Sequence, residues 1–338
     1  MNTEQEDNPA SYPRIRGALD QLALLGIRVP GPTTQSRGKP DRADADCGQS
    51  GVVGSGTIGN ALRRAAIELA SVTDAPRLEA EVLLAHVLET SRTVLMTHPE
   101  RPLTSGQASR YNALVHRRAS NYPLPYLTGC IEFSGLEFEL TPEVLIPRPE
   151  TETLVDLALA RRPRSVVDVG TGSGCIAVSL AVRLPEATVY AIEISPAALA
   201  VARRNAERHG VTERVRLVVG DVLSPRPGPV DLIVSNPPYV PTGKLASLPA
   251  SIRNHEPWLA LDGGPDGLSI IRRLLGQAPA VLRSPASAQG RPGSALLVEI
   301  GADQGKAASR LARAYFPRAT LRVYPDLAGH NRVLEVQT

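Results

Sequence analysis

Between residues 57 and 119 the hydrophobic positions follow a helical rhythm. Thr57 is the expected N-cap of a first helix. Pro76 opens a second helix, and a third is expected over 105–119. Because none of these helices carries a catalytic constellation, they predict a small helical domain without chemistry of its own. The apolar positions that define the first helix are Ile58, Leu62, Ala65 and Leu69, and those on one face of the second are Leu78, Val82 and Ala85.

A β-hairpin and a stiff connector follow the helices. Two apolar runs flank Ser134-Gly135, and glycine supplies the positive φ that a tight turn needs. The connector LIPRPETE at 145–152 leads into a helix, and its two prolines make it rigid. For Arg148 in this connector, the pattern leaves open whether it is a surface charge or part of a site. The expected strands of the hairpin are 131–133 and 136–140.

From residue 164 onward, short apolar strands alternate with amphipathic helices. This alternation predicts a mostly parallel sheet with helices on both faces. Ligands of such sheets bind outside the carboxyl ends of the strands, near the point where the strand order reverses. The expected strands are 165–169, 188–194, 215–219, 231–235, 295–300, 320–324 and 332–337, and the expected helices are 175–183, 196–209, 266–282 and 303–316.

Composition and charge narrow the class of protein. With 338 residues, 42% hydrophobic and 21% charged, the chain is typical of a globular protein of about two domains. Its three cysteines show no metal-ligand spacing and no disulfide framework, and no apolar run could span a bilayer, so we expect a cytoplasmic protein without membrane contact. The net charge of +3 is spread along the chain. Pairs such as Arg117-Arg118 are expected on solvated helix faces, which argues against nucleic-acid binding.

Three successive strand ends carry residues suited to a nucleoside ligand. Gly170, Gly172 and Gly174 form a turn whose spacing differs from the G-x-G-x-x-G of dinucleotide folds. Glu193 ends the next strand, where a carboxylate can accept both hydroxyls of a ribose. Asp221 follows the third strand and is placed for an adenine amino group. Because these strand ends are neighbours in a parallel sheet, we expect a backbone cradle, a ribose acceptor and an adenine acceptor side by side.

A fourth strand ends in Asn-Pro-Pro-Tyr at 236–239, where two prolines remove two backbone donors and fix two φ angles. With the glycine turn, this stretch resembles the class I S-adenosylmethionine-dependent methyltransferases that act on an amino group of a planar, conjugated system. These are adenine-N6 and cytosine-N4 DNA methyltransferases and protein-glutamine methyltransferases. The lone pair of such a nitrogen is delocalised, so the site must hold the NH₂ group rigidly. We expect the Asn236 side-chain oxygen and the Pro237 carbonyl to accept its two N–H groups, with the Tyr239 ring packed against the amide.

The flanking segments choose within this group. TDAPRLEAEVLLAHVL, PLPYLTGCIEFSGLEFELTPEVLIPRPETETLVDLAL and NHEPWLALDGGPDGLSIIRRLL resemble the HemK/PrmC family, over roughly 60–337. The resemblance implies an α/β, Rossmann-like class I fold with a mostly parallel seven-stranded sheet, a small N-terminal helical domain and a β-hairpin connector. It also implies a protein-(glutamine-N5) methyltransferase that uses S-adenosyl-L-methionine, releases S-adenosyl-L-homocysteine and needs no metal. The implied partners are peptide chain release factors, methylated at the glutamine of their Gly-Gly-Gln motif, which modulates translation termination.

The resemblance also assigns residues and domains. The residues expected to contact S-adenosylmethionine are Gly170, Thr171, Gly172, Ser173, Gly174, Glu193, Asp221, Val222 and Asn236. Those expected to hold the glutamine are Asn236, Pro237, Pro238 and Tyr239, and the catalytic residues among them are Asn236, Pro237 and Tyr239. The expected domains are a helical substrate-recognition domain at 56–122, the hairpin and connector at 123–152, and the methyltransferase domain at 153–338. Residues 1–55 have no match in the family, and their Gly-, Pro- and Ser-rich composition without periodicity predicts a disordered tail.

Two other functional classes share part of this pattern. A DNA adenine-N6 methyltransferase would have the same glycine turn and Asn-Pro-Pro-Tyr, but it would also need a basic target-recognition region and a means of flipping the base. No long insertion or concentrated basic block supplies one. A binding protein that keeps the fold as a scaffold would not need the intact constellation. The sequence therefore favours the release factor methyltransferase.

Overall fold

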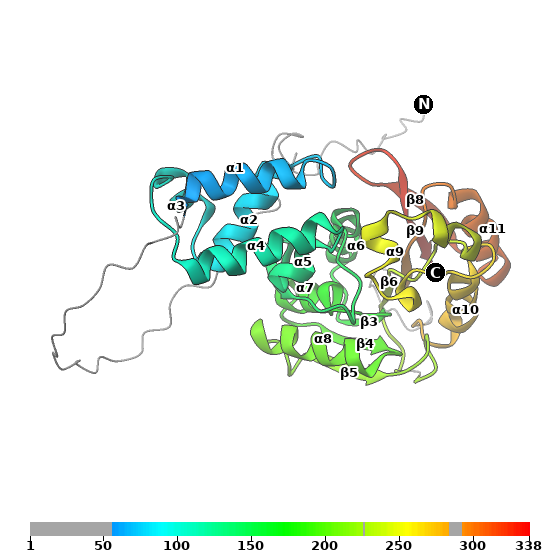
Figure 1. The fold of residues 1–338 in the computed structure, drawn as a ribbon. Helices are drawn as coiled ribbons and strands as arrows, with labels where there is room; N and C mark the ends of the chain where they lie inside the picture. Colours follow the sequence, from blue (N-terminus) through cyan, green and yellow to red (C-terminus); the bar gives the residue numbers. More distant parts are fainter. Residues whose placement is uncertain (1–55, 226, 284–292) are drawn as a thin grey trace, which may run out of the picture.

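The computed structural model describes residues 56–225, 227–283 and 293–338, which form a helical part and a larger α/β part (Figure 1). The tail predicted at 1–55 lies outside the described residues. Within the described residues no helix is long and apolar enough to cross a membrane. The helices of the smaller part are α1 (Ile58–Leu69), α2 (Pro76–Leu88), α3 (Arg92–Thr97), α4 (Ser105–Ala119) and α5 (Leu124–Thr128).

The three helices predicted from periodicity are confirmed, and their starts are set by capping. The Thr57 side chain accepts from the backbone N–H of Asn60 at the start of α1. At the start of α4, Thr104 and Gln107 cap each other's backbone N–H groups in a capping box. Helices α3 and α5 were not predicted, because six and five residues are too few to show a helical period.

Helix α2 is the centre of the helical part, and it corrects two predictions. Apart from its ends it is buried nearly all round, rather than on the one predicted face, because α1, α4 and α5 pack around it. Leu78, expected on the buried face, is only half-buried, whereas Glu79 and Glu81 are buried. Arg118, expected in solvent, is also buried and donates its Nε–H to Glu79 at 2.6 Å. A charge pair inside the helical part therefore replaces a solvated helix face.

The predicted β-hairpin is formed by β1 (Cys130–Phe133) and β2 (Leu136–Glu139), which pair antiparallel. Both turn residues have positive φ, 51° at Ser134 and 72° at Gly135, as a two-residue hairpin turn requires. Phe133 and Phe138 are buried in a hydrophobic cluster with helices of the α/β part. The hairpin therefore packs as part of the core of the α/β part.

The sheet of the larger part has seven strands in the order β5-β4-β3-β6-β7-β9-β8. All neighbours pair parallel except β9, which is antiparallel to β7 and β8. This confirms the predicted mostly parallel seven-stranded sheet. The chain runs from β3 outward to β5 and then returns to β6, so the strand order reverses between β3 and β6. The strands are β3 (Ser165–Val169), β4 (Thr188–Glu193), β5 (Val215–Val219), β6 (Leu232–Ser235), β7 (Ala295–Glu299), β8 (Thr320–Pro325) and β9 (Asn331–Gln337).

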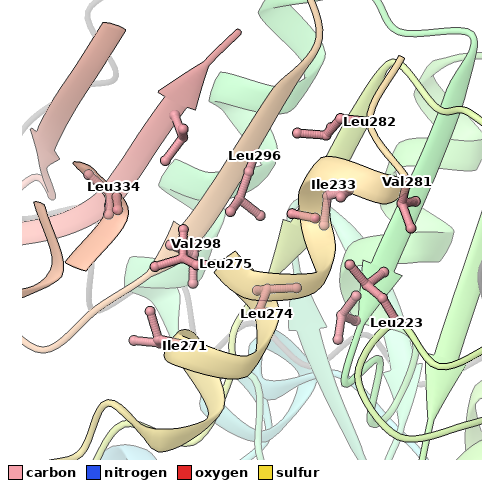
Figure 2. Close-up of a cluster of buried hydrophobic side chains, with 14 of the residues drawn as sticks. Leu223, Ile233, Ile271, Leu274, Leu275, Val281, Leu282, Leu296, Val298 and Leu334 are labelled. Atoms are coloured by element: carbon pink, nitrogen blue, oxygen red, sulfur yellow. The ribbon is translucent and has the colours of Figure 1, made fainter. Parts of the chain in front are cut away.

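Helices cover both faces of this sheet, and each face has its own core. Successive strand residues alternate between the two: Val166 and Leu232 face the cluster of α6, α7 and the hairpin. Val167 and Ile233 face the other cluster, where Figure 2 shows α10 packed over the strands. The predicted helix 266–282 is shorter in the structure, because Pro279 lies in a separate 3₁₀ turn. The helices are α6 (Glu152–Ala160), α7 (Cys175–Arg183), α8 (Pro196–Arg208), α9 (Ala250–Arg253), α10 (Ser269–Gln277) and α11 (Gly305–Tyr315).

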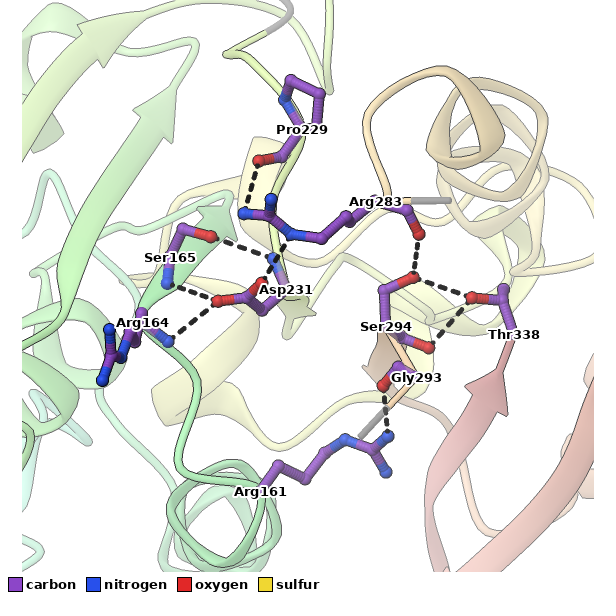
Figure 3. Close-up of polar contacts among 9 residues, drawn as sticks. All are labelled: Arg161, Arg164, Ser165, Pro229, Asp231, Arg283, Gly293, Ser294 and Thr338. Atoms are coloured by element: carbon purple, nitrogen blue, oxygen red, sulfur yellow. Dashed lines mark hydrogen bonds and ion pairs between the residues drawn. The ribbon is translucent and has the colours of Figure 1, made fainter. Parts of the chain in front are cut away.

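At the amino end of β6, a carboxylate ties three segments together. Asp231 Oδ2 accepts from the backbone N–H of Arg164 at 2.9 Å and of Ser165 at 3.0 Å, while Oδ1 accepts from Arg283 Nε at 2.9 Å (Figure 3). Burial raises the pKa of Asp231, but the hydrogen bonds from these three residues outweigh it and the net shift is downward. At this end of the sheet, the hydrogen bonds of Asp231 join the starts of β3 and β6 to the segment that contains Arg283.

Candidate active site

The opposite, carboxyl end of the sheet opens into a cavity of about 420 Å³. Strand register explains why the predicted residues meet here: Val169 of β3 pairs with Ser235 of β6, so the turns that follow both strands lie together at the reversal point. This volume is in the range of small-molecule sites. The predicted residues that line the cavity are Gly170, Gly172, Glu193, Asp221, Val222, Asn236, Pro237 and Pro238.

The glycine turn brings the backbone to the cavity wall. Gly172 has φ +54° and lines the cavity, and a Cβ atom on Gly174 (φ +81°) would lie 3.1 Å from Ala202 Cβ of α8. Thr171 and Ser173 are buried, and Thr171 donates its hydroxyl to Asp168 Oδ2 at 2.6 Å. Neither they nor Gly174 line the cavity. Their predicted contact with a cofactor therefore stays a prediction.

Glu193 is held at the end of β4 by its own surroundings. Its Oε2 accepts from the Gly172 backbone N–H at 2.9 Å, and its Oε1 accepts from the Ser195 backbone N–H at 3.0 Å. The side chain is buried yet lines the cavity. Because each carboxylate oxygen has two acceptor positions, each keeps one for a ligand. The backbone N–H groups of Gly172 and Ser195 thus hold the Glu193 carboxylate in place at the cavity wall.

The turn after β5 adds a second carboxylate. Asp221 lines the cavity and forms an ion pair with Arg273 of α10, which also lines it. Val222 is buried against the cavity at φ +54°, a conformation uncommon for a residue with a branched side chain. Arg273 was not predicted as part of the site, since it lies in the middle of an ordinary amphipathic helix.

The Asn-Pro-Pro-Tyr turn is anchored by a chain of hydrogen bonds that sequence reasoning missed. Asn236 Nδ2 donates to Thr151 Oγ1 at 3.1 Å, and Thr151 Oγ1 donates to Glu299 Oε2 at 2.7 Å. Tyr239 donates its hydroxyl to Glu299 Oε1 at 3.2 Å. Four residues from three segments thus form one network beside the cavity. A signal for Glu299 existed, since it ends a strand of the same parallel sheet as Glu193 does.

Two buried carboxyl groups near this site have raised pKa values. Burial raises the pKa of Glu299 to about 7, and the hydrogen bond from Thr151 and the charge of Arg332 offset part of that shift. Burial likewise raises the pKa of Asp168 to about 7, and the hydrogen bond from Thr171 opposes it. Burial also raises the pKa of Tyr239, so its phenol is neutral at ordinary pH.

The connector and the loop after Tyr239 clamp this turn in place. Arg148 donates to Glu256 Oε1 at 2.6 Å, and the Ile146 backbone N–H donates to Glu256 Oε2 at 3.2 Å. A Cβ atom on Gly263 would lie 2.8 Å from the carbonyl oxygen of Pro238, so only glycine lets the loop approach so closely. Arg148 therefore fixes the connector to the loop at 256–263, which answers the question that its sequence position left open.

Comparisons with known proteins agree with this architecture. The family described as "PrmC N-terminal domain" matches residues 60–129, and "Methyltransferase small domain" matches residues 149–251. The chain is 48% identical to the release factor glutamine methyltransferase of Moorella thermoacetica, over 81% of this chain and 95% of that one. Similar relatives of the same name occur in Geobacter sulfurreducens (46% identity, 68% of this chain, 78% of that one) and Cereibacter sphaeroides (41%, 82% and 97%).

Proposed function

The chain belongs to the release factor glutamine methyltransferases, and from this membership we propose its reaction in detail. It transfers a methyl group from S-adenosyl-L-methionine to the side-chain amide nitrogen, N5, of the glutamine in the Gly-Gly-Gln motif of peptide chain release factors. The observation that carries the proposal is the anchored amide of Asn236 at the cavity wall. Its Nδ2 is engaged by Thr151, which leaves Oδ1 available to accept an N–H of a substrate.

The lining of the cavity supports S-adenosyl-L-methionine as its ligand. Because Gly172 has no side chain, a ligand can approach the backbone of this turn closely. Each carboxylate oxygen of Glu193 keeps one acceptor position for a ribose hydroxyl. Asp221 and Val222 are assigned to the adenine. When bound, the cofactor supplies a methyl group on a sulfonium centre, which is electrophilic enough for a weak nitrogen nucleophile. We assign the other backbone contacts to the cofactor to Gly170, Thr171, Ser173 and Gly174.

The target amide is held by the residues after β6. The Asn236 Oδ1 and the Pro237 carbonyl each accept one N–H of the glutamine amide, which fixes the plane of the NH₂ group. Pro237 and Pro238 prevent both acceptors from relaxing, so no reorganisation is needed as charge develops. Since the Tyr239 hydroxyl is bound to Glu299, we assign the substrate contact of Tyr239 to its ring.

We assign recognition of the release factor to the helical domain at 56–122. One glutamine side chain fills only a small pocket, whereas a stable protein complex buries about 1,200–2,000 Å². The helical domain has its own hydrophobic core and carries none of the residues assigned to chemistry. A shortened chain for testing this should retain the hairpin, because Phe133 and Phe138 belong to the core of the α/β part. On an intact release factor, its kcat/KM should fall well below that of the full chain.

The test of the reaction is methylation with labelled S-adenosyl-L-methionine. The protein is incubated with purified release factors, with a variant carrying Gly-Gly-Glu in place of Gly-Gly-Gln, and with adenine-containing duplex DNA. Peptide mass spectrometry should place one methyl group on the motif glutamine and none on the Gly-Gly-Glu variant. Label in the DNA and none in the release factors would overturn the proposal in favour of an adenine-N6 methyltransferase, which the named relatives do not favour.

A further inference from the structure

Glu299 is a buried carboxyl group for which the reaction above needs no covalent role. It lies at the carboxyl end of β7, next to β6, with only 1% of its surface exposed. Its two oxygens accept from two hydroxyls, those of Thr151 and Tyr239. Among the residues that the structure describes, no backbone N–H or arginine is bonded to this carboxyl group, in contrast to Asp231 at the other end of the sheet. A buried carboxyl group with two hydroxyl donors and no bonded cation is uncommon, because burying a charge without a partner costs free energy.

The donors and acceptors in this network allow one orientation of the Asn236 amide. An ionised carboxylate can only accept, so the single hydroxyl proton of Thr151 is directed to Glu299. Thr151 Oγ1 can then only accept from Asn236, and the group that Asn236 presents to it must be the NH₂. The two ends of the amide are chemically different but similar in shape, so such a network is what assigns them. Oδ1 is left as the acceptor for substrate.

We propose that Glu299 is a positioning residue that acts through Thr151 to keep the Asn236 side-chain oxygen, and not its NH₂ group, directed at the target amide. This inference rests on the proposed function, since it concerns how the same site holds its substrate. When Glu299 is protonated it becomes a donor, and its O–H can donate a hydrogen bond to Thr151 Oγ1. The Thr151 hydroxyl is then free to donate to Asn236 Oδ1, and the flipped amide offers the substrate N–H a donor instead of an acceptor.

The charged and titratable groups that interact with Glu299, besides Tyr239, come from β9, from the turn beside Thr151 and from the start of α7. Arg332 of β9 favours the ionised form, although its guanidinium is already paired with Asp326 at 3.0 Å. Glu150, in the turn beside Thr151, opposes ionisation. The thiol of Cys175 at the start of α7 is close enough for its own pKa to respond to the charge of Glu299, and burial raises that pKa too far for it to ionise at neutral pH.

This network predicts a pH dependence with a definite sign. The ionised form of Glu299 is the competent one, and burial raises the pKa of this carboxyl to about 7. Activity should therefore be complete well above pH 7 and should fall as pH drops through that value, approaching a tenfold loss per pH unit. The profile of kcat/KM reports the free enzyme, in which this pKa applies.

The experiment compares four variants with the wild-type chain on an intact release factor. Glu299→Gln removes the titration, and Thr151→Val removes the hydroxyl at nearly constant shape. Thr151→Ser restores the hydroxyl. Glu335→Gln is the control, because Glu335 is also a buried carboxylate that accepts a tyrosine hydroxyl, from Tyr324 at 2.9 Å. Glu335 pairs in addition with Arg161, and it does not line the cavity. For each variant, kcat, KM, S-adenosylmethionine affinity and the thermal midpoint are measured from about pH 5.5 to 9.

We expect Glu299→Gln and Thr151→Val to lower kcat by about 10- to 100-fold while cofactor affinity changes only a few-fold. This is less than the roughly 10²- to 10³-fold cost of removing an oriented group outright, because both variants keep the Asn236 side chain. The acid limb should disappear in Glu299→Gln. Thr151→Ser should recover most of the activity that Thr151→Val loses, and Glu335→Gln should keep both kcat and the acid limb.

An acid limb that persists in Glu299→Gln would overturn the proposal and would point to another buried carboxyl such as Asp168. Thr151→Val with wild-type kcat would overturn it as well, and this uncharged variant keeps the test valid even if Glu299→Gln does not fold. A wild-type chain that methylates no release factor at all would contradict the proposed function instead, so the two failures are distinguishable.

Discussion

Two carboxylates at opposite ends of one sheet have opposite surroundings. Asp231, at the amino end of β6, accepts from two backbone N–H groups and an arginine, and its net pKa shift is downward (Figure 3). Glu299, at the carboxyl end of β7, accepts from two hydroxyls, and burial raises its pKa to about 7. The first carboxylate joins segments of the core. The second acts through Thr151 on the orientation of the Asn236 amide in the cavity wall.

The two carboxylates differ because backbone N–H groups lie next to Asp231, whereas side-chain hydroxyls lie next to Glu299. At the amino end, Asp231 lies directly beside the start of β3, and the N–H groups of Arg164 and Ser165 fill both acceptor positions of its Oδ2. At the carboxyl end, the turns leave the sheet to form the cavity, so side chains must satisfy one another. Variants at the carboxyl end should therefore change activity, whereas variants at the amino end should change stability.

The largest effect is expected at Asn236. Asn236→Ala removes the oriented acceptor of the target amide, so kcat should fall by about 10²- to 10³-fold, as for loss of one donor or acceptor that acts on the transition state. The dissociation constant for S-adenosylmethionine should stay within a few-fold of wild type. Steady-state kinetics and calorimetry measure the two quantities. Asn331→Ala, which removes an exposed amide that donates to the backbone carbonyl of Ala302, is the control. Near-normal kcat in Asn236→Ala would remove this residue from the mechanism.

Glu193→Ala should weaken cofactor binding next most strongly. The carboxylate is fixed by two backbone N–H groups and is assigned to the ribose, and hydrogen bonds to a charged group contribute about 1.5–3 kcal/mol. The dissociation constant for S-adenosylmethionine should therefore rise by about 10- to 100-fold. Titration calorimetry provides the measurement. Unchanged affinity would mean that the ribose is held elsewhere.

Asp231→Asn should affect stability and leave the chemistry alone. Loss of the charged acceptor for the N–H groups of Arg164, Ser165 and Arg283 should lower the free energy of unfolding by about 1.5–3 kcal/mol. Because the folded pKa of Asp231 is lowered, its contribution is complete above the unfolded value of about 3.9 and is lost as pH falls through the folded value. Denaturant unfolding should show a constant difference at neutral pH that vanishes in acid. A drop in kcat of the folded variant would contradict the comparison.

The smallest effect is expected from Arg273→Ala at the cavity rim. The Arg273–Asp221 pair is nearly half exposed on both sides, and such pairs contribute about 0–1 kcal/mol. Stability should hardly change, and cofactor affinity should change at most a few-fold. Thermal unfolding and calorimetry test both. A large loss of affinity would give this arginine a direct cofactor contact and extend the functional edge of the sheet to α10.

Much of this architecture was predictable from local sequence. The strand 165–169, the helix 175–183 and the hairpin turn at Ser134-Gly135 follow from apolar period and turn chemistry. The glycine turn, Glu193 and Asn236 were placed together because parallel strands share one carboxyl edge. Burial of Arg118 was not predictable, because its partner Glu79 lies 39 residues away on a helix whose surroundings only packing defines.

By itself, the sequence determined the family, the sheet and the edge at which its ligands would lie, because period, turn residues and parallel topology are local or follow general rules. Only the tertiary structure decided which side chains form hydrogen bonds with one another at that edge. Thr151 contacts Asn236, 85 positions away in the sequence, and Glu299, 148 positions away. These contacts form where the end of the proline-containing connector lies beside the carboxyl ends of β6 and β7. Periodicity carries no information about such a pairing. Which hydroxyl reaches which carboxylate depends on the packing of the connector, the loop at 256–263 and the sheet together.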